Sequence, residues 1–181
     1  MSSELQYESL TTVSDLIRRK RLLSAELTEM ALRRIAQLDG QYQAYATVLP
    51  ERALKQAKAA DAEIARGLWR GPLHGVPLAV KDLCYTTFAP TRAGTAIFKA
   101  FTPSFNATVV ERLEDGGAVI LGKLQMTEGA YTSHHPEVAP PLNPWNTGYW
   151  VGSSSTGSGV HHVAMHVGHG VAFAFAGPQR F

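Results

Sequence analysis

The sequence lacks most of the features that mark secreted, membrane or nucleic-acid-binding proteins. Its 181 residues include one cysteine, Cys84, so no disulfide can form within the chain, and this content fits a reducing compartment. Residues 1–10 contain no apolar signal region, and no stretch reaches the roughly 18 apolar residues of a membrane span. We therefore expect a cytoplasmic protein with no membrane partner.

Charge is also sparse and nearly balanced. Charged residues make up 18% of the chain, and the formal net charge is +2. The one dense basic run, residues 18–21, is typical of a solvated helix end, so we predict no nucleic-acid partner. Hydrophobic residues make up 45%, which indicates a globular chain that is long enough to bury a core.

Hydrophobic periodicity predicts an α/β fold. Helical spacing covers three N-terminal segments, namely residues 12–20, 24–40 and 53–66. Further along, an apolar strand at 78–80, a helix at 106–115 and an apolar strand at 118–121 follow one another, with another helix starting near Met126. This alternation predicts N-terminal helices followed by part of a mixed, largely parallel sheet that is flanked by helices.

Two segments outside the regular pattern could support chemistry. Lys81 emerges from the first apolar strand, where it is either simply exposed or partly desolvated, and desolvation would let it act as a base. Residues 152–159 are almost entirely Gly, Ser and Thr. They resemble half of a phosphate-binding loop but lack its lysine, and the same composition is typical of a flexible linker.

Four histidines gather near the C-terminal end of the sequence. His162, His166 and His169 have a spacing that could place three imidazoles near one helix face and bind zinc. No glutamate accompanies them, so the metalloprotease pattern is absent, and core, capping or exposed roles explain each histidine equally well. We expect no metal and no cofactor.

Several motifs in order resemble those of the amidase signature family. The first is Gly71-Pro-Leu-His-Gly-Val-Pro-Leu-Ala-Val-Lys-Asp-Leu, and Pro90-Thr-Arg-Ala-Gly-Thr follows it. Asn106-Ala-Thr-Val-Val-Glu-Arg-Leu and Gly117-Ala-Val-Ile-Leu-Gly-Lys, with Met126-Thr-Glu, come next. Asn143-Pro-Trp-Asn-Thr then leads to Ser153-Ser-Ser-Thr-Gly-Ser-Gly-Val. The resemblance extends from about residue 10 to Val160.

The resemblance implies a hydrolase that cleaves the C–N bond of carboxylic amides by a Ser–cis-Ser–Lys mechanism. The catalytic lysine corresponds to Lys81, and the bridging serine, which follows an unusual cis peptide bond in this family, corresponds to Ser154. The neighbouring loop residues are implied to support the site: Ser153, Ser155, Thr156 and Gly157. A serine hydroxyl needs a base at neutral pH, and a relay serine can both donate and accept a proton.

The sequence departs from the family after Val160. The family's nucleophilic serine lies about two dozen residues beyond the bridging serine, near Pro178 here, but no Ser, Thr, Cys or Asp follows Ser158. We expect residues 1–160 to form a partial, truncated amidase signature domain with exposed apolar edges. Residues 161–181 would be a divergent tail, which we hypothesise to be out of frame, and the isolated chain would be inactive.

Three functions therefore remain open. The first is an amidase for a small-molecule amide, and the sequence does not exclude the related amidotransferases that act on misacylated tRNA. The second is a non-catalytic pseudoenzyme or interaction protein that retains part of the fold. The third is a metal-binding tail on a residual domain.

Overall fold

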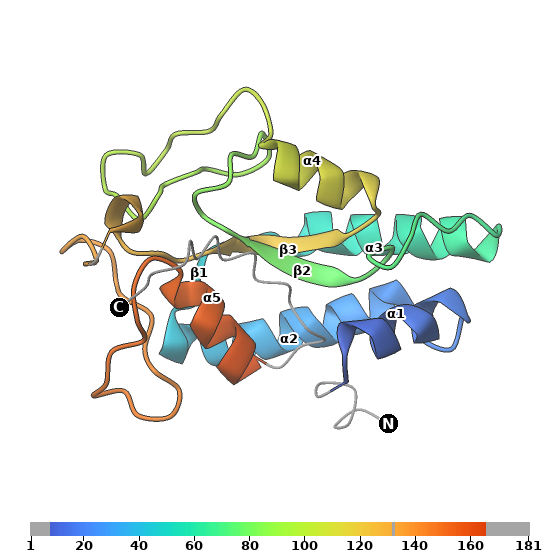
Figure 1. The fold of residues 1–181 in the computed structure, drawn as a ribbon, viewed down its shortest axis with the longest axis horizontal. Helices are drawn as coiled ribbons and strands as arrows, with labels where there is room; N and C mark the ends of the chain where they lie inside the picture. Colours follow the sequence, from blue (N-terminus) through green and yellow to red (C-terminus); the bar gives the residue numbers. More distant parts are fainter. Residues whose placement is uncertain (1–7, 132, 166–181) are drawn as a thin grey trace, which may run out of the picture.

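A computed structural model describes residues 8–131 and 133–165 of the chain. A three-stranded sheet lies at the centre, with helices on both of its faces (Figure 1). Within the described part of the chain, no helix is long and apolar enough to cross a membrane.

Three helices form the N-terminal part, as their periodicity predicts: α1 (Leu10–Arg18), α2 (Ser24–Tyr42) and α3 (Pro50–Ala65). Pro50 occupies the first turn of α3, where its missing N–H has no helical partner to lose. The second helix continues past Gly40, its predicted end, and stops at Gln43, whose φ of 54° is left-handed. A glycine inside a helix costs about 1 kcal/mol. Leu38 and Tyr42, on either side of Gly40, pack against the core and offset that cost.

The sheet is mixed, in agreement with the predicted fold class. Its strands are β1 (Tyr45–Val48), β2 (Pro77–Lys81) and β3 (Val119–Leu124), in the order β1-β3-β2. The β2–β3 pair is parallel and places Lys81 opposite Leu124, whereas the β1–β3 pair is antiparallel. Every residue of β2 and β3 is buried, as is usual for parallel strands that are covered on both faces.

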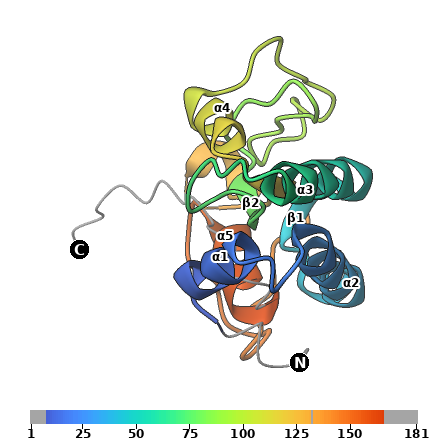
Figure 2. The same ribbon diagram turned by 90° about the vertical axis from the view of Figure 1, so that its right-hand side faces the viewer.

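A helical crossover joins the two parallel strands. The connection contains α4 (Thr108–Asp115), which lies on one face of the sheet, while α2 and α5 lie on the other (Figures 1 and 2). Val110 and Leu113 of α4 pack on Leu78, Val80 and Ile120. Alternate residues of the same strands point to the opposite face, which is the period-2 pattern of a strand.

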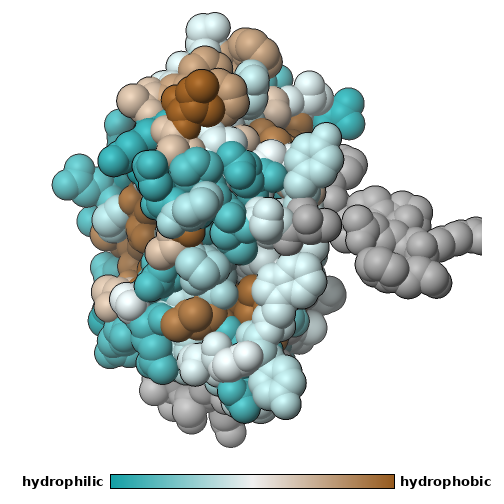
Figure 3. Space-filling model, turned by 90° about the vertical axis from the view of Figure 1, so that its left-hand side faces the viewer, coloured by the Kyte–Doolittle hydropathy of each residue, from teal (hydrophilic) through white to brown (hydrophobic). Residues whose placement is uncertain are grey.

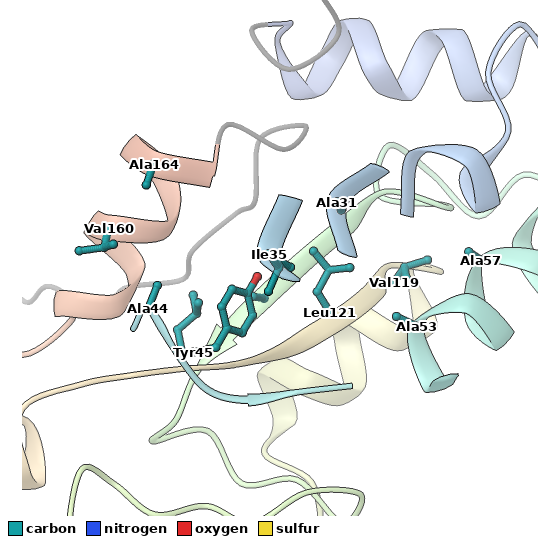
Figure 4. Close-up of a cluster of buried hydrophobic side chains, with 12 residues drawn as sticks. Ala31, Ile35, Ala44, Tyr45, Ala53, Ala57, Val119, Leu121, Val160 and Ala164 are labelled. Carbon is teal, nitrogen blue, oxygen red and sulfur yellow. The ribbon is translucent and has the colours of Figure 1, made fainter. Parts of the chain in front are cut away.

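The largest core cluster fills that opposite face (Figure 4). It joins α2 and α3 to β3, with Ile35 and Ala53 packing near Val119 and Leu121. A second cluster, around Ile17 and Val76, holds α1 against the start of β2.

The C-terminal part of the described chain is mostly irregular. The helix predicted near Met126 is wrong: only a short 3₁₀ turn, η2 (Glu128–Ala130), forms there, because Gly129 and Ala130 both have positive φ. The chain becomes helical again at α5 (Thr156–Val160), which continues into one π-helical turn, η3 (His161–Met165).

The first residues after Val160 belong to the packed structure. His161 is 1% exposed and Ala164 is 9% exposed, and Ala164 joins the largest core cluster with Val160 (Figure 4). Residues 166–181, which hold most of the predicted tail, lie outside the described residues. The division at residue 160 therefore stays a prediction.

Candidate active site

The candidate site lies at the carboxyl ends of the two parallel strands. Lys81 is the last residue of β2, and Gln125, Met126 and Thr127 directly follow β3. In open α/β sheets, ligands bind beside the carboxyl ends of parallel strands, where loops rather than helices cover the sheet. The loop that contains residues 152–155 crosses this end and leads into α5.

Lys81 and Ser154 are brought into direct contact. The Lys81 Nζ lies 2.6 Å from the Ser154 Oγ, although 73 positions separate the two residues. Lys81 is only 2% exposed, whereas Ser154 is half-buried. The two residues that the family resemblance singles out therefore form one hydrogen-bonded pair.

Hydrogen bonds from the chain after β3 fix the serine loop. The Ser154 N–H donates to the Thr127 Oγ1 over 3.0 Å. The Ser153 hydroxyl donates to the Tyr131 carbonyl over 3.0 Å, and the Thr127 hydroxyl donates to the same carbonyl. Thr127 thus orients Ser154, although its sequence motif indicates no such role.

The backbone at Ser154 differs from the expectation. All peptide bonds of the described residues are trans, so the cis bond implied for the bridging serine is not present. Here a trans backbone with a φ of 59° at Ser154 already allows Ser154 to form its hydrogen bonds with both Lys81 and Thr127.

The rest of the Gly/Ser segment is packed rather than free, which excludes the flexible-linker interpretation. Thr156 and Ser158 are 1% and 3% exposed. A Cβ on Gly157 would lie 2.3 Å from the Ala44 carbonyl oxygen, so only glycine fits there. Within the described residues, the hydroxyls of Ser155, Thr156 and Ser158 are buried without a hydrogen-bond partner. Such hydroxyls remain able to bind another group.

Burial lowers the pKa of the Lys81 amine, because a desolvated ammonium loses its hydration. Proximity to the Cys84 thiol acts in the opposite sense and is the smaller effect. Among the described residues, no carboxylate lies within ion-pair distance of Lys81. The environment therefore favours a neutral amine, which can accept a proton.

The sequence motifs did not single out a second buried lysine in this region of the structure. Lys123 of β3 and Asp82 are both 0% exposed, and the Lys123 Nζ lies 3.1 Å from the Asp82 Oδ1. The available signal was the charge itself, because a lysine inside an apolar strand requires a buried partner.

The histidine cluster gains no support as a metal site. Within the described residues, no group of three or more His, Cys, Asp or Glu is placed to hold a metal ion. His166 and His169 lie outside the described residues, as does Pro178, near which the resemblance places the nucleophile. His161 is instead a core residue, with its Nδ1 3.1 Å from the Tyr45 hydroxyl.

Comparison with known proteins identifies the family. The family model described as Amidase matches residues 26–172, which extends beyond Val160, where the motif resemblance ends. The chain therefore belongs to the amidase family.

Individual relatives agree with this assignment. The "Putative amidase AmiD" of Mycobacterium tuberculosis is 60% identical over 86% of this chain and 33% of its own length. A glutamyl-tRNA(Gln) amidotransferase subunit of Anaeromyxobacter dehalogenans is 47% identical over 82% of this chain and 30% of its own. The chain thus spans about a third of the curated relatives that it matches.

Solved structures show the same fold over about a third of their own chains. The peptide amidase of Stenotrophomonas maltophilia superposes with a TM-score of 0.77 at 32% identity, covering 86% of this chain and 34% of that one. A second structure is a chain from a vestigial protein complex that is described as revealing the evolutionary origins of an s-triazine catabolic enzyme. It superposes with a TM-score of 0.83 at 36% identity, covering 88% of this chain and 36% of that one.

Proposed function

We propose that this chain supplies the lysine–serine half of an active site that hydrolyses small carboxylic amides. Lys81 is the base and Ser154 is the bridging serine. The observation that supports this most directly is the 2.6 Å contact between the Lys81 Nζ and the Ser154 Oγ.

The local chemistry suits a proton relay. A neutral Lys81 accepts the Ser154 hydroxyl proton, while the Ser154 oxygen accepts a proton from a second hydroxyl that attacks the amide carbon. Burial of Lys81 favours its neutral form, and the Thr127 contact to the Ser154 N–H keeps the hydroxyl facing the amine. Ser153, Ser155, Thr156 and Gly157 shape the loop around this pair.

The relay requires a nucleophile, which the printed sequence does not offer at the expected place. No Ser, Thr, Cys or Asp follows Ser158. We therefore expect the chain as printed to show no amide turnover, because removal of a catalytic serine alone abolishes nearly all activity. The relatives are named for amidase and amidotransferase activities, which supports an amide as the substrate class.

The test joins residues 1–160 to the remaining two thirds of the Mycobacterium tuberculosis relative, and measures hydrolysis of a panel of aryl and alkyl amides. We expect hydrolysis by the joined protein, and a loss of at least about 10³-fold in kcat/KM in Lys81→Ala and in Ser154→Ala. Lys99→Ala and Ser104→Ala change an exposed lysine and an exposed serine, and should leave the rate unchanged. Full activity in Lys81→Ala would sink the assignment of the base.

A non-catalytic protein is the second candidate, and the missing nucleophile is the observation that favours it. It predicts that the lysine–serine pair supports no catalysis even when the rest of the fold is supplied, so that the joined protein folds but hydrolyses no amide. Circular dichroism and thermal unfolding of the joined protein separate this outcome from simple misfolding.

A further inference from the structure

The loop that follows β2 packs directly on the turn that follows β3. Gly94 of this loop is buried and has a φ of 68°. A Cβ at Gly94 would lie 2.7 Å from the carbonyl oxygens of both Met126 and Thr127. Those oxygens belong to the backbone, which cannot turn aside as the end of a long side chain can, so only glycine allows the two segments to approach this closely.

Backbone hydrogen bonds connect the same segments. The Ala93 carbonyl accepts the Gly129 N–H over 2.8 Å, and the Ala93 N–H donates to the Asp82 carbonyl over 3.3 Å. Asp82 directly follows Lys81, the last residue of β2. Residues 92–94, which we call the bridging loop, therefore join the end of β2 to the turn after β3.

Thr127 links the bridging loop to Ser154. Its hydroxyl donates to the Tyr131 carbonyl, so its oxygen can accept the Ser154 N–H, which lies 3.0 Å away. Thr127 is 0% exposed, and its own carbonyl is one of the two that a Cβ at Gly94 would meet. A displacement of the Thr127 backbone would therefore also displace the acceptor of the Ser154 N–H.

The conformation of Ser154 depends on such a contact. Its φ of 59° lies in the left-handed region, which a residue with a side chain rarely adopts unless its surroundings hold it there. In this conformation the N–H faces the Thr127 Oγ1 and the hydroxyl lies 2.6 Å from the Lys81 Nζ. Release of the N–H would let the backbone relax and would carry the hydroxyl away from Lys81.

We propose that the bridging loop, with Gly94 at its closest approach, is a positioning element that holds Ser154 against Lys81 by fixing Thr127. The loop acts through Thr127 and takes no part in the proton transfer. This inference rests on the proposed function, in which Ser154 relays a proton to Lys81. A relay is sensitive to such support, because a misplacement of about 1 Å can lower a rate by about 10²-fold.

The first test measures amide hydrogen exchange by NMR in the 181-residue chain, with the buried Val119 amide of β3 as the internal reference. Gly94→Ala should speed exchange at Ser154 and Gly129 by at least about tenfold relative to Val119. Gly67→Ala is the matched control, because Gly67 also has a positive φ, 87°, but an added Cβ would meet no atom within 4 Å. That variant should leave both ratios unchanged.

An unchanged or lower ratio at Ser154 in Gly94→Ala would overturn the proposal. A variant that is only less stable overall raises exchange at Val119 at least as much as at Ser154, and so cannot produce the expected result.

The second test separates the hydroxyl of Thr127 from its shape, in the joined protein described above. Thr127→Val keeps the shape and should lower kcat, per folded protein, by about 10²-fold, whereas Thr127→Ser keeps the hydroxyl and should stay within about tenfold. Thr28→Val is the matched control, because Thr28 is also 0% exposed but its hydroxyl has no hydrogen-bond partner among the described residues. That change should leave kcat unchanged.

A purely structural role for Thr127 predicts the reverse order, with Thr127→Val active and Thr127→Ser impaired, and that order would overturn the inference. The two threonine variants also keep the test decisive if Gly94→Ala does not fold. The proposed function fails separately, if the joined protein hydrolyses no amide while the exchange rates at Ser154 follow the expected pattern.

Discussion

At the scale of single residues, Gly157 marks how closely the serine loop approaches the sheet. Its N–H donates to the Gln125 carbonyl over 2.9 Å, and a Cβ there would lie 2.3 Å from the Ala44 carbonyl oxygen. Backbone atoms cannot move aside as a side chain can, so the loop itself would have to shift away from β3.

We therefore expect Gly157→Ala to lower the free energy of unfolding by about 1–3 kcal/mol. Gly159→Ala is the matched control, because Gly159 is exposed, lies in the same helix, and would have no atom within 4 Å of an added Cβ. That change should be neutral or stabilise the chain by up to about 1 kcal/mol. Urea unfolding of the three proteins measures both, and equal stabilities would contradict the packing described for Gly157.

His161 gives the chain a predicted dependence of stability on pH. Burial lowers its pKa from 6.5 to about 4, because the core disfavours the charged imidazolium, and nearby His162 adds to the effect. Between these two values the unfolded chain binds more protons than the folded one. The free energy of unfolding should therefore fall as the pH is lowered from about 6.5 to about 4, by up to about 3 kcal/mol.

Two variants test whether the burial of His161 causes this dependence of stability on pH. His161→Phe removes the titrating group and should flatten this part of the pH profile. Tyr45→Phe removes only the hydroxyl that contacts the His161 Nδ1, and should keep the profile because burial is the main cause of the shift. Thermal unfolding at several pH values tests both, and an unchanged slope in His161→Phe would show that other groups are responsible.

The residues of the site were predictable to different degrees. Lys81 and Ser154 follow from the family motifs, and the structure brings the two together. Thr127 was not predicted, because its role depends on the position of a loop that starts about two dozen residues later in the sequence. Lys123 and Asp82 each fit their motifs, but only the side-chain contact in the folded chain shows that they are partners.

At the scale of secondary-structure elements, the helices support one another at their ends. The first two N–H groups of α2, at Ser24 and Ala25, donate to the Asp61 carboxylate of α3 over 2.7 Å and 3.0 Å. A carboxylate at a helix N-terminus also interacts favourably with the helix dipole. Asp61 therefore acts as an N-terminal cap that is supplied by a different helix.

We expect Asp61→Ala to lower the free energy of unfolding by about 1–2 kcal/mol, the usual cost of losing a cap. Asp15→Ala is the control, since Asp15 makes only solvent-exposed ion pairs at the end of its own helix and should lower the free energy of unfolding much less. Chemical denaturation measures the difference. Equal losses in the two variants would contradict a capping role for Asp61.

Element prediction succeeded where the hydrophobic pattern is long or flanked by clear breaks. The two buried strands and the crossover helix between them follow from the sequence, within a few residues at each end. Strand β1 was missed, because four residues are too few to show a period and only pairing with β3 makes them a strand. Asp39 helps to place it by accepting the N–H groups of Ala44 and Tyr45.

At the scale of the whole molecule, the exposed apolar side chains lie on loops rather than on strands. Trp145, Tyr149 and Trp150 are 84%, 70% and 64% exposed, whereas β2 and β3 are buried throughout. The expectation of exposed apolar strand edges is therefore wrong for the edge strand β2, whereas β1, at the other edge, is partly exposed. One face of the molecule shows separate hydrophobic patches among hydrophilic residues (Figure 3).

The candidate site exists only through the assembly of the whole described chain. Parallel pairing aligns the ends of β2 and β3, α4 connects them, and α5 anchors the serine loop through Thr156 and Val160 in the core. The motif order predicts which residues take part. Their distances depend on the packing of all these elements, which local sequence patterns do not determine.

The most direct test of this account is a high-resolution crystal structure that locates the Lys81 Nζ and the Ser154 Oγ. We predict a hydrogen bond between them, close to the 2.6 Å described here, with Lys123 paired to Asp82. A Lys81 amine that instead turns towards a carboxylate, with Ser154 bonded elsewhere, would contradict the relay and the amidase chemistry proposed from it.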